Sequence, residues 1–110
     1  MALVGENNVH AWCQLEQSGT HSCRDSYNIL GVADMGVGRT KFTFSGNAVN
    51  NDYVWTGNSG NVSSTTTSPR TVNNDGSMSE SQFSIRNLQT NSGAQDDTMV
   101  NIIVVSDGWG

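Results

Sequence analysis

Two histidines and two cysteines near the start of this 110-residue chain are the side chains best suited to chemistry, namely His10, Cys13, His21 and Cys23. Imidazole nitrogens and thiolates are zinc ligands, but the spacing H-x2-C-x7-H-x-C matches no common zinc-binding pattern. Alternation along a strand also places His10 and Cys13 on opposite faces. We therefore predict no metal site and no cofactor.

The two cysteines could instead form a disulfide. Cys13 and Cys23 enclose nine residues and lie on the two arms of an expected hairpin, so their Cβ atoms can come close. The sequence begins without an apolar secretory core, which indicates synthesis in a cytoplasm, where thiols stay reduced. The sequence leaves both alternatives open, a disulfide and two free thiols. We favour two half-buried free thiols.

No pattern in the chain is typical of a catalytic site. Asp96 and Asp97 are adjacent, so their carboxylates would point apart. The Gly36-Val37-Gly38 segment lacks the third glycine and the following helix of a phosphate-binding loop. Neither histidine lies in a recognisable catalytic motif. We predict that the protein is not an enzyme.

Aromatic side chains are the best candidates for ligand binding. Trp12, Tyr53 and Trp55 could stack on sugar rings, because an aromatic face beside polar neighbours suits a carbohydrate. The alternative is that they belong to the core or to a subunit interface, and we favour it because large aromatics dominate small cores.

A subunit interface is expected near the end of the sequence. Trp109 is flanked by glycines and is poorly placed to be central to a monomer's core, so a neighbouring chain is a natural contact for it. We expect it to act together with the apolar residues of the last strand, namely Val100, Ile102 and Val104.

Composition favours a sheet protein. The chain contains 13 Asn, 14 Ser, 10 Thr and 12 Gly, with only 14% charged residues and one proline. A disordered chain carries more charge and proline, and long helices need more Ala, Leu, Glu and Lys. Five scattered Lys and Arg under a net charge of -5 argue against nucleic acid as a partner. The longest apolar run, from Ile102 to Val105, is too short for membrane insertion.

Alternation of apolar and polar residues predicts about seven strands separated by turns. We expect strands at residues 9–15, 22–32, 39–45, 52–56, 62–72, 77–87 and 99–106, with Pro69 restricting the fifth to an edge strand or an extended loop. We expect turns at 17–20, 34–38, 57–61 and 73–76. The last strand contains the continuous apolar run Ile102 to Val105 and is expected to be buried on both faces. The expected fold is all-β, a single antiparallel β-sandwich or Greek-key barrel spanning residues 1–110, with residues 1–8 as an irregular N-terminal arm.

One stretch of the chain also carries a family resemblance. It consists of Ala11-Trp12, Gly19, Ser26-Tyr27-Asn28-Ile29, Asp34, Gly36-Val37-Gly38, Phe42-Thr43-Phe44, Asn51 and Asp52-Tyr53-Val54, with local departures at Cys13 and Met35. In this order the segments resemble small structural proteins and tail-fibre segments of tailed bacteriophages, and the segment from Val100 to Ser106 also fits. The resemblance covers about residues 11 to 55. It implies a virion component, often trimeric, and brings no catalytic residues with it.

We therefore expect a non-enzymatic structural protein on the exterior of a tailed-phage virion. The first interpretation is a tail-fibre or fibre-knob type appendage subunit, a homo-oligomer and specifically a trimer, that contacts host-surface glycans and other virion proteins of the tail. The alternative is a capsid decoration (cement) protein that stabilises the head by binding the major capsid protein. The second alternative is a free carbohydrate-binding module. Association between copies would cover exposed strand edges.

Overall fold

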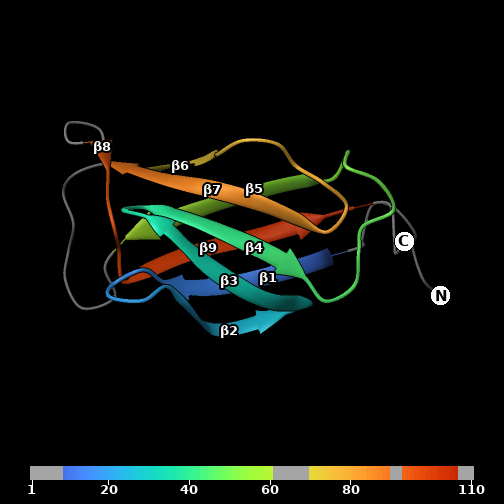
Figure 1. The fold of residues 1–110 in the computed structure, drawn as a ribbon, viewed down its shortest axis with the longest axis horizontal. Helices are drawn as coiled ribbons and strands as arrows, with labels where there is room; N and C mark the ends of the chain where they lie inside the picture. Colours follow the sequence, from blue (N-terminus) through green and yellow to red (C-terminus); the bar gives the residue numbers. More distant parts are fainter. Residues whose placement is uncertain (1–8, 61–69, 90–92, 107–110) are drawn as a thin grey trace.

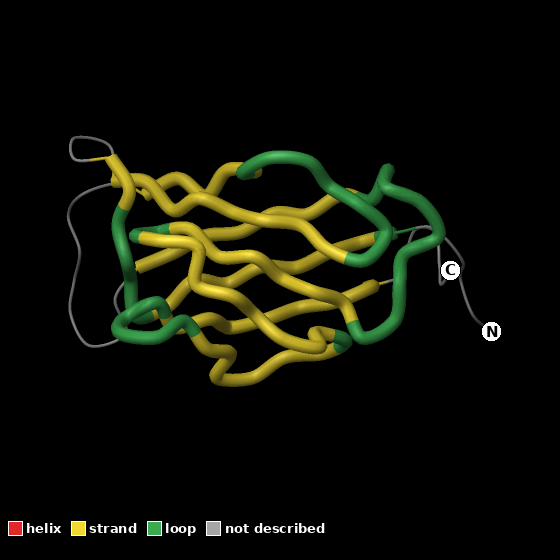
Figure 2. The backbone as a smooth tube through the Cα atoms, in the orientation of Figure 1, coloured by secondary structure: helices red, strands yellow, loops and turns green. Residues whose placement is uncertain are grey.

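The computed structural model describes residues 9–60, 70–89 and 93–106. In it, two antiparallel sheets pack face to face (Figures 1 and 2). These ranges contain strands, turns and loops and no helix. The expected all-β fold with an antiparallel sandwich is confirmed. The N-terminal arm at 1–8, Trp109 and most of the expected strand at 62–72 lie outside the described residues.

The first sheet has four strands in the order β2-β1-β9-β5. Its strands are β1 (Val9–Glu16), β2 (Ser22–Tyr27), β5 (Val54–Gly60) and β9 (Met99–Val105). The second sheet has the order β3-β4-β7-β6, with β8 paired to β7 outside this path. Its strands are β3 (Ile29–Gly36), β4 (Arg39–Phe44), β6 (Arg70–Asn74), β7 (Gln82–Gln89) and β8 (Gly93–Ala94).

Asn28 divides the expected strand at residues 22–32 into β2 and β3, which belong to different sheets. Its φ is +57°, in the left-handed region that asparagine tolerates better than most residues. Its side-chain amide donates to the carbonyl oxygens of His10 and Gly46, 2.9 and 3.1 Å away. Its side-chain oxygen accepts from the Gly46 N–H at 2.7 Å. The chain therefore passes from one sheet to the other at a single, well-anchored residue.

The core lies between the two sheets, and alternate side chains of β4 and β7 enter it, as the two-residue period of a strand requires. Phe42 and Phe83 stack at 5.1 Å between ring centroids, and Trp55 contacts Phe83 at 5.4 Å. The buried hydrophobic residues are Ala11, Cys13, Leu15, Phe42, Phe44, Ala48, Tyr53, Phe83, Ile85, Val100, Ile102 and Val104.

Strand β9 is buried on one face only, so the expectation of burial on both faces is wrong. Ile103 is 39% exposed, whereas Val100, Ile102 and Val104 are at most 3% exposed. The assignment of Val100, Ile102 and Val104 to a subunit interface is therefore also wrong, because their side chains point between the sheets of their own chain. The apolar segment from Ile102 to Val105 is continuous in the sequence because Ile103 is apolar although its side chain is on the outer face. There it lies opposite Trp12 of β1.

Gly57 was expected to begin a turn and instead lies inside β5, which continues to Gly60. It pairs with Ile102 of β9 in the middle of the ladder. A Cβ atom at Gly57 would stand 2.6 Å from the Asn101 carbonyl oxygen and 3.0 Å from the Ile102 Cγ2. The glycine therefore serves close packing between neighbouring strands rather than chain reversal.

Candidate functional site

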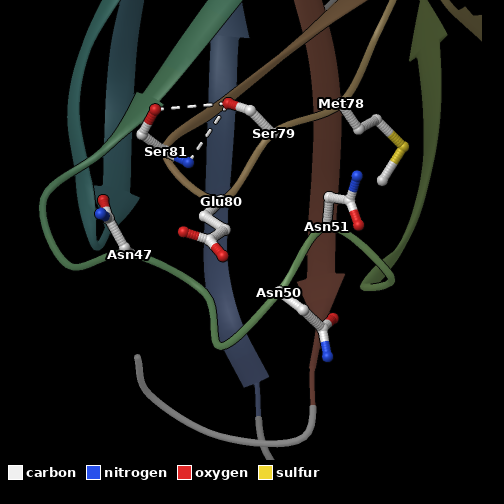
Figure 3. Close-up of a pocket in the computed structure, with 7 residues that line it drawn as sticks. All are labelled: Asn47, Asn50, Asn51, Met78, Ser79, Glu80 and Ser81. Carbon is white, nitrogen blue, oxygen red and sulfur yellow. Dashed lines mark hydrogen bonds between the residues drawn. The ribbon is translucent and has the colours of Figure 1, made fainter.

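A pocket of about 400 Å³ opens at the end of the sandwich where β4 ends and β7 begins (Figure 3). It is lined by Asn47, Asn50, Asn51, Met78, Ser79, Glu80 and Ser81. These residues come from two loops, 45–53 and 75–81, that lie side by side at one end of the molecule in Figure 2. Asparagine amides, serine hydroxyls and one carboxylate supply the polar groups of this lining, beside apolar surface of nearly equal extent.

Backbone hydrogen bonds hold the two loops against each other. The Ala48 N–H donates to the Glu80 carbonyl oxygen, and the Phe44 N–H donates to the Ser81 carbonyl oxygen, both at 2.9 Å. Asn28 adds a third anchor through its bond from the Gly46 N–H. The antiparallel pairing of β4 with β7 thus extends into the loops and fixes the width of the pocket.

Tyr53 lies beneath the pocket and not on its surface. Its side chain is 5% exposed, and its hydroxyl donates to the Ser79 carbonyl oxygen at 2.9 Å, with the Gln82 carbonyl oxygen also within reach at 3.1 Å. Burial raises the pKa of Tyr53 to about 12, so the hydroxyl keeps the proton that it donates. The assignment of Tyr53 to ligand contact is wrong, because its apolar ring belongs to the core.

The serine and asparagine side chains also shape the loops. Ser79 accepts hydrogen bonds from the N–H groups of Ser81 and Gln82, at 3.3 and 3.2 Å. Asn50 accepts from the Asp52 N–H at 2.8 Å, a local turn that asparagine favours. Figure 3 shows the Glu80 carboxylate directed between Asn47 and Asn50.

The polar side chains of the pocket can exchange hydrogen bonds with a ligand. Amides both donate and accept hydrogen bonds, and the Glu80 carboxylate accepts them, which together match a ligand rich in hydroxyl groups. The Met78 thioether adds one apolar contact.

The three aromatic residues expected to bind a ligand are not brought together. Trp55 is half-buried against Phe83, and its indole N–H donates to the Asn74 side chain at 3.4 Å. Trp12 is 37% exposed on the opposite, outer face of the four-stranded sheet, paired with Tyr27 of β2. Trp12 faces outward and Trp55 faces the partner sheet, so their two side chains cannot share a site.

The outer face of the four-stranded sheet carries a second, smaller hollow of about 170 Å³. It is lined by Thr56, Gly57, Asn58, Asn101, Ile102 and Ile103. Asn101 donates to the Asn58 side chain at 3.0 Å, so the amides that line this hollow already bond to each other. Its volume is below that of most small-molecule sites, which makes the loop pocket the stronger candidate.

The histidines and cysteines occupy three separate places. His10 packs edge-on against Phe44, with ring centroids 4.6 Å apart. The two cysteines are neighbours on β1 and β2. Among the residues with a described placement, no three His, Cys, Asp or Glu side chains are grouped to bind a metal ion.

His21 belongs to a buried polar network at the other end of the sandwich. Its Nδ1 is 2.8 Å from the Thr40 hydroxyl and its Nε2 is 3.2 Å from an Asp96 oxygen. A hydroxyl, an imidazole and a carboxylate in this order also occur in hydrolases. Thr40 is 0% exposed, however, and its hydroxyl accepts a bond from Gln17 at 3.0 Å. The arrangement therefore satisfies buried polar groups and offers no hydroxyl to a substrate.

The fold places the chain in the class of antiparallel two-sheet β-sandwiches, and comparison with known proteins adds nothing more specific. No protein-family description, no curated protein and no solved structure matches it significantly. Within the described ranges, no helix has the length and apolar character needed to cross a bilayer.

Sequence reasoning missed the loop pocket, although one signal for it was present. Three of its residues, Asn47, Asn50 and Asn51, cluster in an asparagine-rich loop. The other side of the pocket comes from residues 78–81, about thirty positions further along the chain. Only the pairing of β4 with β7 brings the two halves together.

Proposed function

We propose that this protein is a non-catalytic β-sandwich domain that binds a carbohydrate in the loop pocket formed by residues 47–51 and 78–81. The observation that carries the proposal is the lining of that pocket, where three amides, two hydroxyls and one carboxylate surround a space of about 400 Å³. This volume is within the range of small-molecule sites, roughly 300–1,000 Å³. Sugar hydroxyls can donate to Glu80 and exchange hydrogen bonds with the asparagine amides.

The proposed setting is the exterior of a tailed-phage particle, as an oligomeric appendage subunit. The resemblance carried by residues 11–55 supports this setting. Exposed apolar side chains on the outer face of the four-stranded sheet also support contact with other subunits, namely Val9, Trp12, Tyr27, Val54 and Ile103. Several identical pockets on one particle would multiply a weak affinity for surface glycans.

A capsid decoration protein remains the alternative, supported by the same outer face. Such a protein would use that face to bind the major capsid protein and would need no glycan. A free carbohydrate-binding module, the second alternative, would use the pocket and remain a monomer. Sedimentation at micromolar concentration separates the last alternative from the other two, and the copy number per particle separates head from tail.

The binding function can be tested with a glycan array. We expect the wild-type protein to bind a subset of glycans, and the Glu80→Gln variant to lose at least about tenfold in affinity for them, because a charge-assisted hydrogen bond is lost. Glu16→Gln is the matched control, since Glu16 pairs with Arg24 at 2.9 Å on β1 and β2 and lies outside the pocket. Absence of glycan binding, or equal binding by Glu80→Gln, would contradict the proposal.

A further inference from the structure

Cys13 and Cys23 are brought together by a β-bulge between the first two strands. Gln14 pairs with Asp25 and Leu15 pairs with Cys23, so Arg24 is an extra residue on β2. The register shift sets Cys23 diagonally across from Cys13, and the two sulfur atoms lie 2.6 Å apart. Cys13 is buried and Cys23 is half-buried, and both are thiols.

This separation is only about half an ångström longer than the ~2.05 Å of a disulfide bond. The backbone already holds the strands in a regular antiparallel ladder on both sides of the pair. Closure therefore requires a small side-chain adjustment and no rearrangement of the sheet. We propose that Cys13 and Cys23 form a reversible intramolecular disulfide, and that the pair is a thiol–disulfide exchange site.

The environments of the two thiols assign them different roles. The hydrogen bond between the two side chains lowers the pKa of Cys23, and a further bond to Ser26 acts in the same direction. The same interaction, together with burial, raises the pKa of Cys13. Cys23 is also the more exposed of the two thiols. Cys23 is therefore the thiol that reacts first with an external disulfide. Cys13 is the resolving thiol, which then displaces the bound group from Cys23.

The reaction proceeds in two exchanges with a low-molecular-weight disulfide such as oxidised glutathione. The Cys23 thiolate attacks one glutathione sulfur, forming a mixed disulfide and releasing one glutathione thiolate, which takes up a proton. Cys13 then loses its proton and its sulfur attacks that of Cys23, which forms the protein disulfide and releases the second glutathione. The protein dithiol is oxidised by two electrons, and one glutathione disulfide is reduced to two thiols.

The bond would tie an edge strand to the interior of its sheet. Strand β2 is hydrogen-bonded on one side only, to β1, so, like β5 at the other edge, it is held by fewer hydrogen bonds than the two interior strands of the four-stranded sheet. A Cys13–Cys23 bond closes a short loop that includes the hairpin turn. The pair stays reduced in a reducing compartment and closes in an oxidising one, so the domain becomes more stable once outside a cytoplasm.

Equilibration of the purified wild-type protein with glutathione buffers of increasing oxidised fraction tests this inference. Alkylation in denaturant followed by mass measurement counts the thiols. We expect a monomer that takes up two alkyl groups under reducing conditions and none under oxidising conditions, with Tm higher by about 10 °C in the oxidised form. Two alkylatable thiols after oxidation, or disulfide-linked dimers on a non-reducing gel, would overturn the proposal.

Single variants separate the two roles. Cys13→Ser keeps the half-buried thiol and is expected to accumulate a mixed disulfide with glutathione at Cys23. Cys23→Ser keeps only the buried thiol and is expected to remain unmodified while folded. Neither variant should show the redox-dependent change in Tm. If either variant does not fold, the wild-type thiol count and Tm alone decide the matter, and the glycan array is unaffected because the pair lies outside the pocket.

Discussion

The hydroxyl of Tyr53 donates a hydrogen bond to the carbonyl oxygen of Ser79, 2.9 Å away, so a side chain of the core holds one wall of the surface pocket. The Tyr53 ring is fixed in turn by edge contacts with Phe44 and Phe83, at 5.4 and 6.1 Å between centroids. The shape of the pocket is therefore coupled to the packing of the aromatic core.

Replacement of Tyr53 by phenylalanine should weaken the pocket while it preserves the core. The ring remains, but the Ser79 carbonyl oxygen loses its buried donor, which costs about 1 kcal/mol in the free energy of unfolding. We expect a severalfold loss of glycan affinity, because Ser79 and its neighbours are less firmly placed. Urea unfolding and glycan titration measure the two effects.

The control for this variant is Tyr27→Phe. Tyr27 is 44% exposed on β2 and is not among the residues that line the loop pocket. Its replacement should leave glycan affinity unchanged. Equal losses of affinity in the two variants would show that Tyr53 does not act on the pocket.

Arg70 and Asp97 form a buried ion pair whose disruption should be costly. The Arg70 Nε and one terminal nitrogen donate to the two Asp97 carboxylate oxygens at 2.8 and 3.2 Å, and both side chains are at most 10% exposed. Asn87 donates to the same carboxylate at 2.8 Å. Asp97→Ala leaves a buried cation without its counter-ion, so we expect a loss of about 3–5 kcal/mol in urea unfolding.

Asp75→Ala provides the matched comparison for Asp97→Ala. Asp75 pairs with Arg39 at 2.8 Å and with Arg86 at 3.9 Å, but these arginine side chains are 42% and 46% exposed. Solvent screens these pairs, so their loss should cost no more than about 1 kcal/mol. Similar losses in the two variants would mean that burial of the Arg70–Asp97 pair is unimportant.

Stability should fall in mild acid because of His10. Burial lowers the pKa of His10, and a backbone interaction at Gly46 opposes this only in part. The folded chain therefore keeps the imidazole neutral, while the unfolded chain takes up a proton below about pH 6.5. Because the unfolded state binds more protons there, the free energy of unfolding decreases as pH falls from about 7, by at most about 1.4 kcal/mol per pH unit from this group.

Urea unfolding between pH 5 and 7.5 checks this dependence, with His10→Gln as the comparison. Glutamine keeps a polar side chain near the Asn28 amide, whose nitrogen lies 3.3 Å from His10 Nε2 in the wild type. The variant should have a smaller loss of stability on acidification than the wild type. The same slope in both proteins would assign the acid sensitivity to other groups.

The strand positions could be predicted where side chains alternate without interruption. Phe42, Phe44, Phe83 and Ile85 enter the core as the period of two requires. Alternation did not predict the buried side chains correctly where the backbone is irregular. A register shift between Val9 and Ala11 turns His10 into the core and leaves Val9 outside, and composition alone contains no signal for such a bulge.

The candidate site was harder to predict than the fold. Trp12 and Trp55 have the same chemistry in the sequence, yet Trp12 faces solvent while Trp55 packs against Phe83. Which face of a strand is buried depends on the partner sheet. The pocket itself depends on pairing between β4 and β7, which are separated in the chain by β5 and β6. Sequence spacing does not determine such a pairing.

Glycan binding in the loop pocket is tested most directly by an amide-resolved NMR titration of the wild-type protein with a glycan selected on the array. If the glycan binds in the pocket, chemical shifts will change for the side-chain amides of Asn47, Asn50 and Asn51 and for the backbone of residues 78–81, which line it. Saturating glycan that leaves these signals unmoved, or that shifts only signals of the outer sheet face around Trp12 and Asn101, would contradict glycan binding in the pocket.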